Sequence, residues 1–226
     1  MASYGQYCPV AKATELLGDR WTLLIVRELI YGPIRFSDIE RNLPGISRST
    51  LSQRLKRMQR DGIATRDDDG AYVFTEAGEA LRPVVATLGE WVTRWVLADP
   101  TRDEADPELL MLYISRHVES DELPAGRVVI EWHFTDQGRR IWLTLEPDDV
   151  SVCVENPCLP VDLWVSGDTL ELYRVYLHRC TLDDALARGT VELTGLAEMR
   201  SGFRRWIRWS DFNRPDAPPL TDQRAG

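Results

Sequence analysis

Two patterns of hydrophobic residues divide this chain. Up to about residue 98, apolar residues recur three or four positions apart, whereas from about residue 128 they alternate with polar ones. The first pattern predicts amphipathic helices, and the second predicts β-strands with one buried face. Between them lies the polar stretch 99–106, which contains Pro100 and is followed by Pro107. This composition predicts a linker. We therefore expect two domains, at 1–98 and 107–212, followed by a tail at 213–226.

The first half is expected to hold four helices, a hairpin and a further long helix. Helices are predicted from Pro9 to Gly18, from about Arg20 to Tyr31, from about Ser37 to Pro44, and from the N-cap Ser47 to Gly62. Residues 63–66 and 71–74 flank an Asp-Gly turn and predict a two-stranded hairpin. Thr75 is expected to cap the long helix that follows. This order of elements indicates a winged helix-turn-helix.

The fourth predicted helix has two distinct faces. Leu51, Leu55 and Met58 lie at i, i+4 and i+7 and form one apolar stripe, while Ile46 and Leu51 occupy the positions of a hydrophobic staple. The opposite face carries hydroxyl, amide and basic side chains. A recognition helix needs one face to pack on its neighbours and another to offer such groups to the major groove. The alternative interpretation of this face is a basic helix surface that only contacts solvent.

Candidate DNA contacts follow from position along this helix. Side chains in its first turns are expected to contact base edges, and Lys56, Arg57 and Arg60, further along, are expected to contact phosphates. The acidic turn 67–69 would repel phosphate, so the hairpin is expected to contact DNA through Arg66 or hardly at all. Besides Arg60, the expected DNA-binding residues are Arg35, Ser37, Ser47, Arg48, Ser49, Thr50, Ser52, Gln53, Lys56, Arg57 and Arg66.

The net charge of −9 argues at first against nucleic acid. The acidic excess lies in residues 99–226, however, and residues 1–98 are nearly balanced. From Ser47 to Arg60 the only charged side chains are basic. Local positive charge, more than the average over the chain, determines phosphate binding.

The first half resembles the HxlR-type winged-helix regulators. The matching runs are Cys8-Pro9-Val10, Leu17-Gly18-Asp19-Arg20-Trp21-Thr22-Leu23-Leu24-Ile25, Gly32-Pro33-Ile34-Arg35-Phe36-Ser37-Asp38-Ile39, Pro44-Gly45-Ile46-Ser47-Arg48-Ser49-Thr50-Leu51-Ser52-Gln53-Arg54-Leu55 and Phe74-Thr75-Glu76-Ala77-Gly78. The resemblance implies a homodimer, packed through the first and the long last helix of the domain, on a roughly palindromic operator. The family usually has Gly-Gly-Lys-Trp where this chain has Gly18-Asp19-Arg20-Trp21, and its hairpin is usually less acidic.

Cys8 is a candidate redox sensor. It directly precedes Pro9 at the expected start of a helix, where free backbone amides and the helix dipole favour a thiolate. Lys12, one turn on, would add positive charge. Some regulators that the chain resembles sense oxidants or electrophiles through a cysteine at this place, and the resemblance implies the same for Cys8. The alternative is a cysteine that only packs or caps at the dimer contact.

The second half is predicted to form an α+β domain. Alternating runs near 128–134, 141–145, 150–154 and 161–165 predict an antiparallel sheet, with helices near 107–118, 168–179 and 195–209. Residues 161–170, 181–189 and 191–195 resemble, faintly, the sterol-carrier-like fold. That resemblance implies a cavity for a small apolar effector. Trp132, Phe134, Trp142 and Trp164 are the candidate lining residues, and ordinary core packing is the alternative.

Other classes of protein find little support. The chain contains no HExxH, GxSxG or phosphate-binding loop, and Cys153 and Cys158 have no histidine nearby for a zinc site, so neither an enzyme nor a cofactor is expected. No apolar run is long enough to span a membrane and no secretory signal is visible, so we expect a cytoplasmic protein. The favoured hypothesis is a DNA-binding regulator with an effector domain. The alternative is a ligand carrier or protein-interaction scaffold whose winged helix does not bind DNA.

Overall fold

The computed structural model describes residues 4–147 and 149–209, and the chain divides into two compact units, Met1–Gly89 and Glu90–Gly226. The division falls inside helix α6 (Arg82–Trp95), upstream of the stretch 99–106. The domain limits at 98 and 107 remain a prediction. The expected tail at 213–226 lies outside the described residues. No helix in the described ranges is long and apolar enough to cross a membrane.

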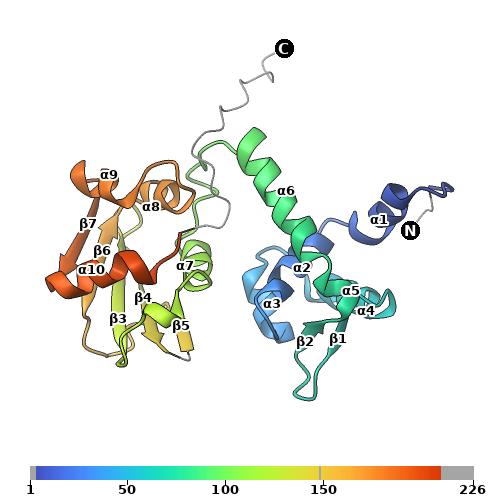
Figure 1. The fold of residues 1–226 in the computed structure, drawn as a ribbon, viewed down its shortest axis with the longest axis horizontal. Coiled ribbons are helices and arrows are strands. Elements are labelled where there is room, and N and C mark those ends of the chain that lie inside the picture. Colours follow the sequence, from blue (N-terminus) through green and yellow to red (C-terminus); the bar gives the residue numbers. More distant parts are fainter. Residues whose placement is uncertain (1–3, 148, 210–226) are drawn as a thin grey trace, which may run out of the picture. The chain divides into compact units, whose positions relative to one another are not determined.

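The N-terminal unit follows the predicted order of helices and hairpin (Figure 1). Four helices come first, then two strands, then a short helix that leads into α6. Their bounds are α1 Pro9–Leu17, α2 Thr22–Ile30, α3 Phe36–Asn42, α4 Arg48–Arg60, β1 Ala64–Arg66, β2 Tyr72–Phe74 and α5 Glu76–Glu79. Strands β1 and β2 pair antiparallel, with Thr65 opposite Val73. The winged helix-turn-helix predicted from the sequence is therefore present.

Helices α2, α3 and α4 enclose the core of this unit. Ile25, Leu51 and Leu55 are completely buried in it. Glu28 of α2 is also completely buried. Its carboxylate accepts a hydrogen bond from Asn42 Nδ2 of α3 at 2.9 Å and pairs with Arg27 at 2.8 Å. A buried charge is tolerated only when it is paired and hydrogen-bonded in this way, so Glu28 fixes how α2 and α3 pack.

Two glycines allow α4, the hairpin and α5 to connect. Gly62 follows α4 with φ +72°, a left-handed conformation that glycine adopts without steric cost. Gly78 lies in α5, and a Cβ there would come within 2.1 Å of the Ile63 carbonyl oxygen. Only glycine permits this close approach of helix and strand.

The long helix predicted after Thr75 is broken into two. Thr75 does act as an N-cap, because its hydroxyl accepts a hydrogen bond from the Gly78 amide at 3.1 Å. It caps only α5, however, and α6 begins anew at Arg82. Pro83 gives the reason: proline has no amide hydrogen to continue the hydrogen bonding of the preceding helical turn, but it is tolerated in the first turn of a new helix.

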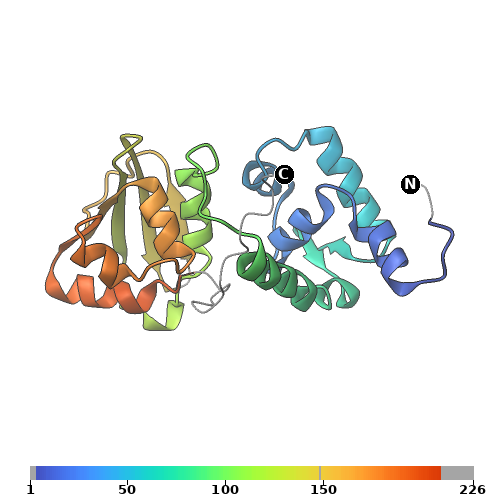
Figure 2. The same cartoon turned by 90° about the horizontal axis from the view of Figure 1, so that it is seen from above.

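The C-terminal unit is an α+β domain. Helices precede, interrupt and follow five strands. The bounds are α7 Pro107–Ser115, η1 Ser120–Glu122, β3 Val128–Phe134, β4 Arg139–Glu146, β5 Asp149–Cys153, β6 Leu163–Gly167, α8 Thr169–Tyr176, α9 Leu182–Ala187, β7 Val191–Gly195 and α10 Ala197–Trp206. The four α-helices gather on one side of the sheet (Figure 2).

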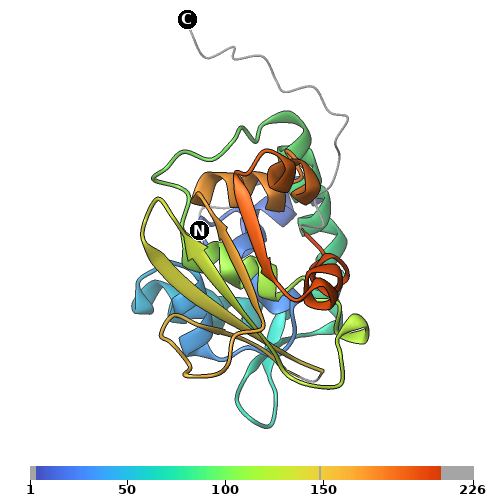
Figure 3. The same cartoon turned by 90° about the vertical axis from the view of Figure 1, so that its left-hand side faces the viewer.

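The sheet is mixed, which corrects the expectation of an antiparallel one. Its strand order is β5-β4-β3-β6-β7, and the strands run side by side in Figure 3. All neighbouring pairs are antiparallel except β3 and β6, which are parallel, with Trp132 opposite Val165. Alternating apolar residues identify strands but not their partners. The connection 154–162 carries the chain past β4 to the far side of β3, and such a crossover produces a parallel pair.

The register assigns each strand residue to one of two faces. Trp132 lies opposite Ile141 and Val165, and these side chains enter the core beneath the helices. Glu131 lies opposite both Trp142 and Trp164, so these three share the other face. The helix-covered face holds the core of the unit, where Trp132, Phe134 and Phe203 are completely buried.

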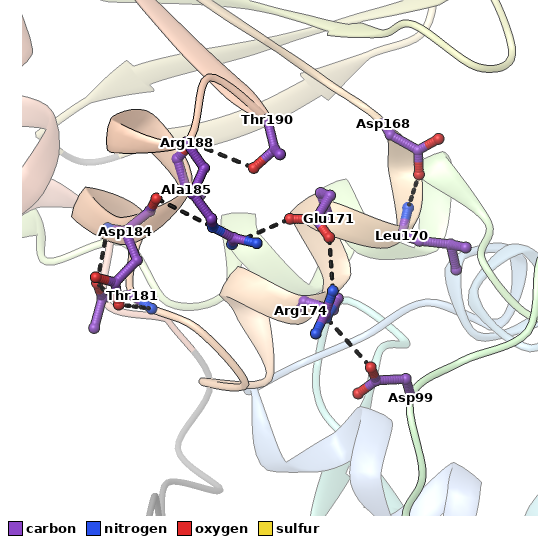
Figure 4. Close-up of polar contacts among 10 residues, drawn as sticks. All are labelled: Asp99, Asp168, Leu170, Glu171, Arg174, Thr181, Asp184, Ala185, Arg188 and Thr190. Carbon is purple, nitrogen blue, oxygen red and sulfur yellow. Dashed lines mark hydrogen bonds and ion pairs between the residues drawn. The ribbon is translucent and has the colours of Figure 1, made fainter.

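The stretch 99–106, expected as a linker, packs on the C-terminal unit. Asp99 pairs with Arg174 of α8 at 3.2 Å, and Arg174 also donates to Glu171 at 2.8 Å (Figure 4). Ala105 is only 4% exposed, and the Tyr173 hydroxyl donates to the Asp106 carbonyl at 2.9 Å. The polar composition that predicted a linker therefore includes charged groups that are paired with this unit, Asp99 with Arg174 and Arg102 with Asp136 and Asp168.

Candidate nucleic-acid interface

Helix α4 is positioned by its cap and its apolar stripe. The Ser47 hydroxyl accepts a hydrogen bond from the Thr50 amide at 3.2 Å, which confirms the predicted N-cap. Leu51, Leu55 and Met58 are all buried, as is Ile46 of the predicted staple. Since these apolar side chains fix the rotation of the helix about its axis, the polar side chains must face outward.

The outward face of α4 is polar and basic. Arg48, Ser49, Gln53, Lys56 and Arg60 are exposed. Along the second half of the helix lies an open hollow of about 820 Å³, lined by Gln53, Arg54, Lys56, Arg57, Gln59 and Arg60. Amide and basic groups on one helix face are the donors and acceptors that major-groove recognition uses.

The hydroxyl groups of the first turn are engaged with one another. The Ser47 hydroxyl lies 2.7 Å from that of Thr50 and 3.1 Å from that of Ser49. Thr50 and Ser52 are half-buried, whereas Ser49 is exposed. Arg48 lies over the Phe36 ring, 5.4 Å from its centroid, and 3.7 Å from the Glu40 carboxylate. In this turn, therefore, Ser49 and Arg48 are the most accessible to a partner.

Arg57, predicted as a phosphate contact, is directed into the protein. Its guanidinium pairs with Asp19 at 2.9 Å and Asp61 at 3.2 Å, and donates to the Glu15 carbonyl at 2.6 Å. Only 21% of the side chain is exposed. Arg54 also pairs with Asp19, at 2.5 Å. Lys56 and Arg60 are thus the exposed cations on this half of the helix.

The entry to α3 supplies two further predicted residues. Arg35 is the N-cap residue of α3, without a side-chain cap, and both it and Ser37 are exposed. The helix begins at Phe36, one residue before the predicted start. Free amide groups at a helix N-terminus favour anions, so Arg35 and Ser37 remain suited to a phosphate.

The hairpin uses part of its acidic turn for its own structure. Asp67 accepts hydrogen bonds from the amides of Ala71 at 2.8 Å and Asp69 at 3.1 Å. Asp68 and Asp69 are exposed. Arg66 lies over the Tyr72 ring, 4.6 Å from its centroid, and donates to the Tyr72 hydroxyl at 2.6 Å. The side chain expected to contact DNA is therefore held against β2, and the tip of the turn carries negative charge.

Two contributions to this face were missed from the sequence. Gln59 lies three residues after Lys56, so helical spacing alone places it on the same face. The contact of Asp19 with α4 had no comparable signal. Asp19 is 35 residues from Arg54 and 38 from Arg57, and only the tertiary structure brings them together.

Cys8 is the N-cap residue of α1 and is partly exposed, as a free thiol. Its side chain makes no capping hydrogen bond. Lys12, expected to support a thiolate, instead pairs with Glu15 at 2.8 Å. Of the two features expected to act on Cys8, Lys12 is thus engaged elsewhere, and the helix N-terminus is present.

The four aromatic residues predicted to line one pocket lie on opposite faces of the sheet. Trp132 and Phe134 are buried beneath the helices, where Trp132 contacts Phe203 and Trp209 at ring-centroid distances of 5.8 and 6.4 Å. Trp142 and Trp164 occupy the other face, and Trp164 is 41% exposed. Because the strand register separates the two pairs, the four cannot line a single cavity. Hollows of about 390, 550 and 420 Å³ on this unit are lined by other residues.

Comparison with known proteins places the first half of the chain. The HxlR-like helix-turn-helix family profile matches residues 16–100. The chain is 38% identical over 103 residues to the HTH-type transcriptional regulator YvaP of Bacillus subtilis, a match that covers 42% of this chain and 94% of YvaP.

Other matches cover the same part of the chain. The regulator Rv3095 of Mycobacterium tuberculosis is 42% identical over 88 residues, which are 36% of this chain and 55% of Rv3095. The crystal structure of quinone-bound YodB from Bacillus subtilis matches 38% of this chain and 96% of its own, at 38% identity and a TM-score of 0.36. With nearly all of YvaP matched at this level of identity, the chain belongs to the HxlR-like helix-turn-helix family of transcriptional regulators.

Proposed function

We propose that this protein binds double-stranded DNA as a homodimer and uses α4 to recognise its operator. One observation carries the proposal: the packed stripe of α4 fixes an outward face of amide and basic groups. Gln53 and Ser49 are assigned to base edges, and Lys56, Arg60 and Arg48 to phosphates. Arg35 and Ser37 contribute at the start of α3. The negative turn at Asp68 and Asp69 leaves the hairpin little part in DNA binding.

The homodimer is assigned to helices α1 and α6. Neither helix contains a buried residue, yet α6 carries Val84, Leu88, Trp91 and Trp95 at helical spacing. Val10 of α1 is 73% exposed. Apolar side chains gathered along exposed helices are typical of a protein contact. A two-fold arrangement of the two α4 helices would then match a roughly palindromic operator.

The C-terminal unit is proposed as the regulatory domain, with a sterol-carrier-like fold. The order strand, helix, short helix, strand in β6, α8, α9 and β7 supports that assignment. An apolar effector in this unit, or thiol chemistry at Cys8, would favour one spacing of the recognition helices over another. Replacing Cys8 by Ser tests the second route. If peroxide or a quinone releases DNA equally from both proteins, Cys8 is not the sensor.

The test of DNA binding is a gel shift with DNA from upstream of the protein's own gene, at two salt concentrations. Gln53→Ala is expected to weaken operator binding by about 1–3 kcal/mol, as loss of a base contact does. Lys56→Ala is expected to reduce the slope of log K against log salt by about 0.9, because one phosphate contact is lost.

A matched control removes an equivalent charge elsewhere. Arg200 is exposed on α10 and lies outside the proposed interface, so Arg200→Ala should leave binding unchanged. Binding that is insensitive to salt and to both α4 substitutions would favour the carrier or scaffold alternative.

A further inference from the structure

Asp19 occupies the turn between α1 and α2, directly beside the recognition helix. Its Oδ2 atom accepts hydrogen bonds from Arg54 Nη1 at 2.5 Å and from Arg57 Nη1 at 2.9 Å. One carboxylate therefore holds two of the basic side chains of α4. This contact links the end of α1 to the helix assigned to DNA recognition.

Three of the five N–H groups of the Arg57 guanidinium donate within the protein, one from each nitrogen atom. Nη1 donates to Asp19, Nη2 donates to the Glu15 carbonyl at 2.6 Å, and Nε donates to Asp61 at 3.2 Å. All three nitrogen atoms are thus engaged within the protein. The neighbouring Lys56 is exposed, so adjacent basic residues on one helix are used in opposite ways.

The Arg54 side chain depends on Asp19 to stay in its partly buried position. Its side chain is 26% exposed, and its Nε atom is buried without a hydrogen-bond partner among the described residues. An unpartnered buried donor is unfavourable, and a guanidinium without a counter-ion would move toward solvent. The charge-assisted bond to Asp19 opposes that movement.

We propose that Asp19 is a positioning residue for DNA recognition: it withholds Arg54 and Arg57 from the DNA backbone and anchors α4 to the end of α1. This inference rests on the proposed function. Contacts between cations and phosphates raise affinity for any sequence. Withholding two cations lowers non-specific affinity, and a fixed α4 keeps Gln53 and Ser49 in one orientation. The ratio of specific to non-specific binding rises as a result.

The decisive measurement is the salt dependence of binding to a fluorescent duplex that lacks the operator. Asp19→Ala should bind this duplex more tightly than the wild type, with a slope of log K against log salt that is steeper by about 0.9 for each arginine that reaches a phosphate. Asp19→Asn retains an oxygen acceptor and should lie between the two. A purely structural role would lower stability without steepening the slope, so an unchanged or shallower slope overturns the proposal.

The adjacent residues Lys56 and Arg57 provide a matched comparison. Lys56→Ala should make the slope shallower by about 0.9, whereas Arg57→Ala should leave it unchanged, although each removes one cation from the same helix. Equal reductions for the two variants would show that Arg57 contacts phosphate, contrary to the proposal.

A measurement without DNA separates failure of this inference from failure of the proposed function. In a double-mutant cycle on thermal unfolding, Asp19→Ala and Arg57→Ala should be non-additive, because each removes the same ion pair. Strict additivity overturns the role of Asp19 whatever the DNA results are. Non-additivity together with wild-type protein that binds no DNA would instead contradict the proposed function, and the positioning role with it.

Discussion

The two units of this protein treat the apolar faces of their helices in opposite ways. In the C-terminal unit, α7, α8 and α10 bury apolar residues in the core under the sheet. In α1 and in the part of α6 that belongs to the N-terminal unit, by contrast, no residue is buried, and Leu88 is 45% exposed. One unit completes its core within a single chain, and the helices at the edge of the other retain apolar surface for a partner. Helical amphipathicity shows that a face will be covered but not which molecule covers it.

The largest expected effect comes from creating a cavity in the core of the C-terminal unit. Phe203→Ala removes a fully buried ring from α10 that packs on Trp132, and it should cost about 3–5 kcal/mol of unfolding free energy. Calorimetry should place this loss in the transition of the C-terminal unit. DNA binding by α4 should persist below that transition. A loss of equal size in both units would show that their cores are not independent.

The next effect tests the uncovered helix. Trp91→Glu places a charge in the apolar stripe of α6 and should weaken the dimer by at least about 2 kcal/mol, roughly thirtyfold, as removal of a central interface tryptophan does. Analytical ultracentrifugation measures the change. Trp164→Glu, at a tryptophan exposed on the sheet, is the matched control and should leave the mass unchanged. If Trp164→Glu weakened the dimer and Trp91→Glu did not, the dimer contact would lie on the sheet.

The smallest effect concerns the ion pairs that hold the stretch 99–106 on α8. Burial would raise the pKa of the Glu171 carboxyl, but hydrogen bonds from Arg174 and Thr190 outweigh burial and lower it. A carboxyl group whose pKa is lowered in the folded state stabilises the fold at pH values above its unfolded pKa, which is about 4.3 for glutamate. That stability is lost as the pH falls through the lower, folded pKa. Unfolding of the C-terminal unit followed from neutral to acid pH should therefore show this loss.

Arg174→Ala should weaken this acid dependence. Because Arg174 is 38% exposed, the change in unfolding free energy should be about 1 kcal/mol or less. Trypsin should also cut more readily after Arg102 when Asp99 loses its ion pair with Arg174 and keeps only the longer one with Arg179. Arg200→Ala is the control. If the wild type, Arg174→Ala and Arg200→Ala lost stability equally in acid, these ion pairs would not be the source of the acid dependence.

Local patterns predicted α4 almost completely. The Ser47 cap, the stripe from Leu51 to Met58 and the glycine stop at Gly62 all depend on residues within one helix, so the sequence contains the whole signal. The break before α6 also had a local cause in Pro83, which outweighed the apolar periodicity from Leu81 onward.

Long-range pairing was not predictable in the same way. The alternation in β3 and β6 located the strands, but their parallel pairing depends on how the connection 154–162 crosses the sheet. The same register placed Trp132 and Trp142 on opposite faces, which no count along one strand could show.

The sequence by itself determined the helical and strand periodicities, the caps and turns, and the polar and basic face of α4, because each is set by residues a few positions apart. The tertiary structure decided which basic groups on that face are free. Asp19 and Glu15 are far from Arg57 along the chain, and the burial of apolar stripes on α2 and α4 brings them within hydrogen-bonding distance. A charged side chain is available to a partner only when the fold has not already paired it, and that depends on distance in space.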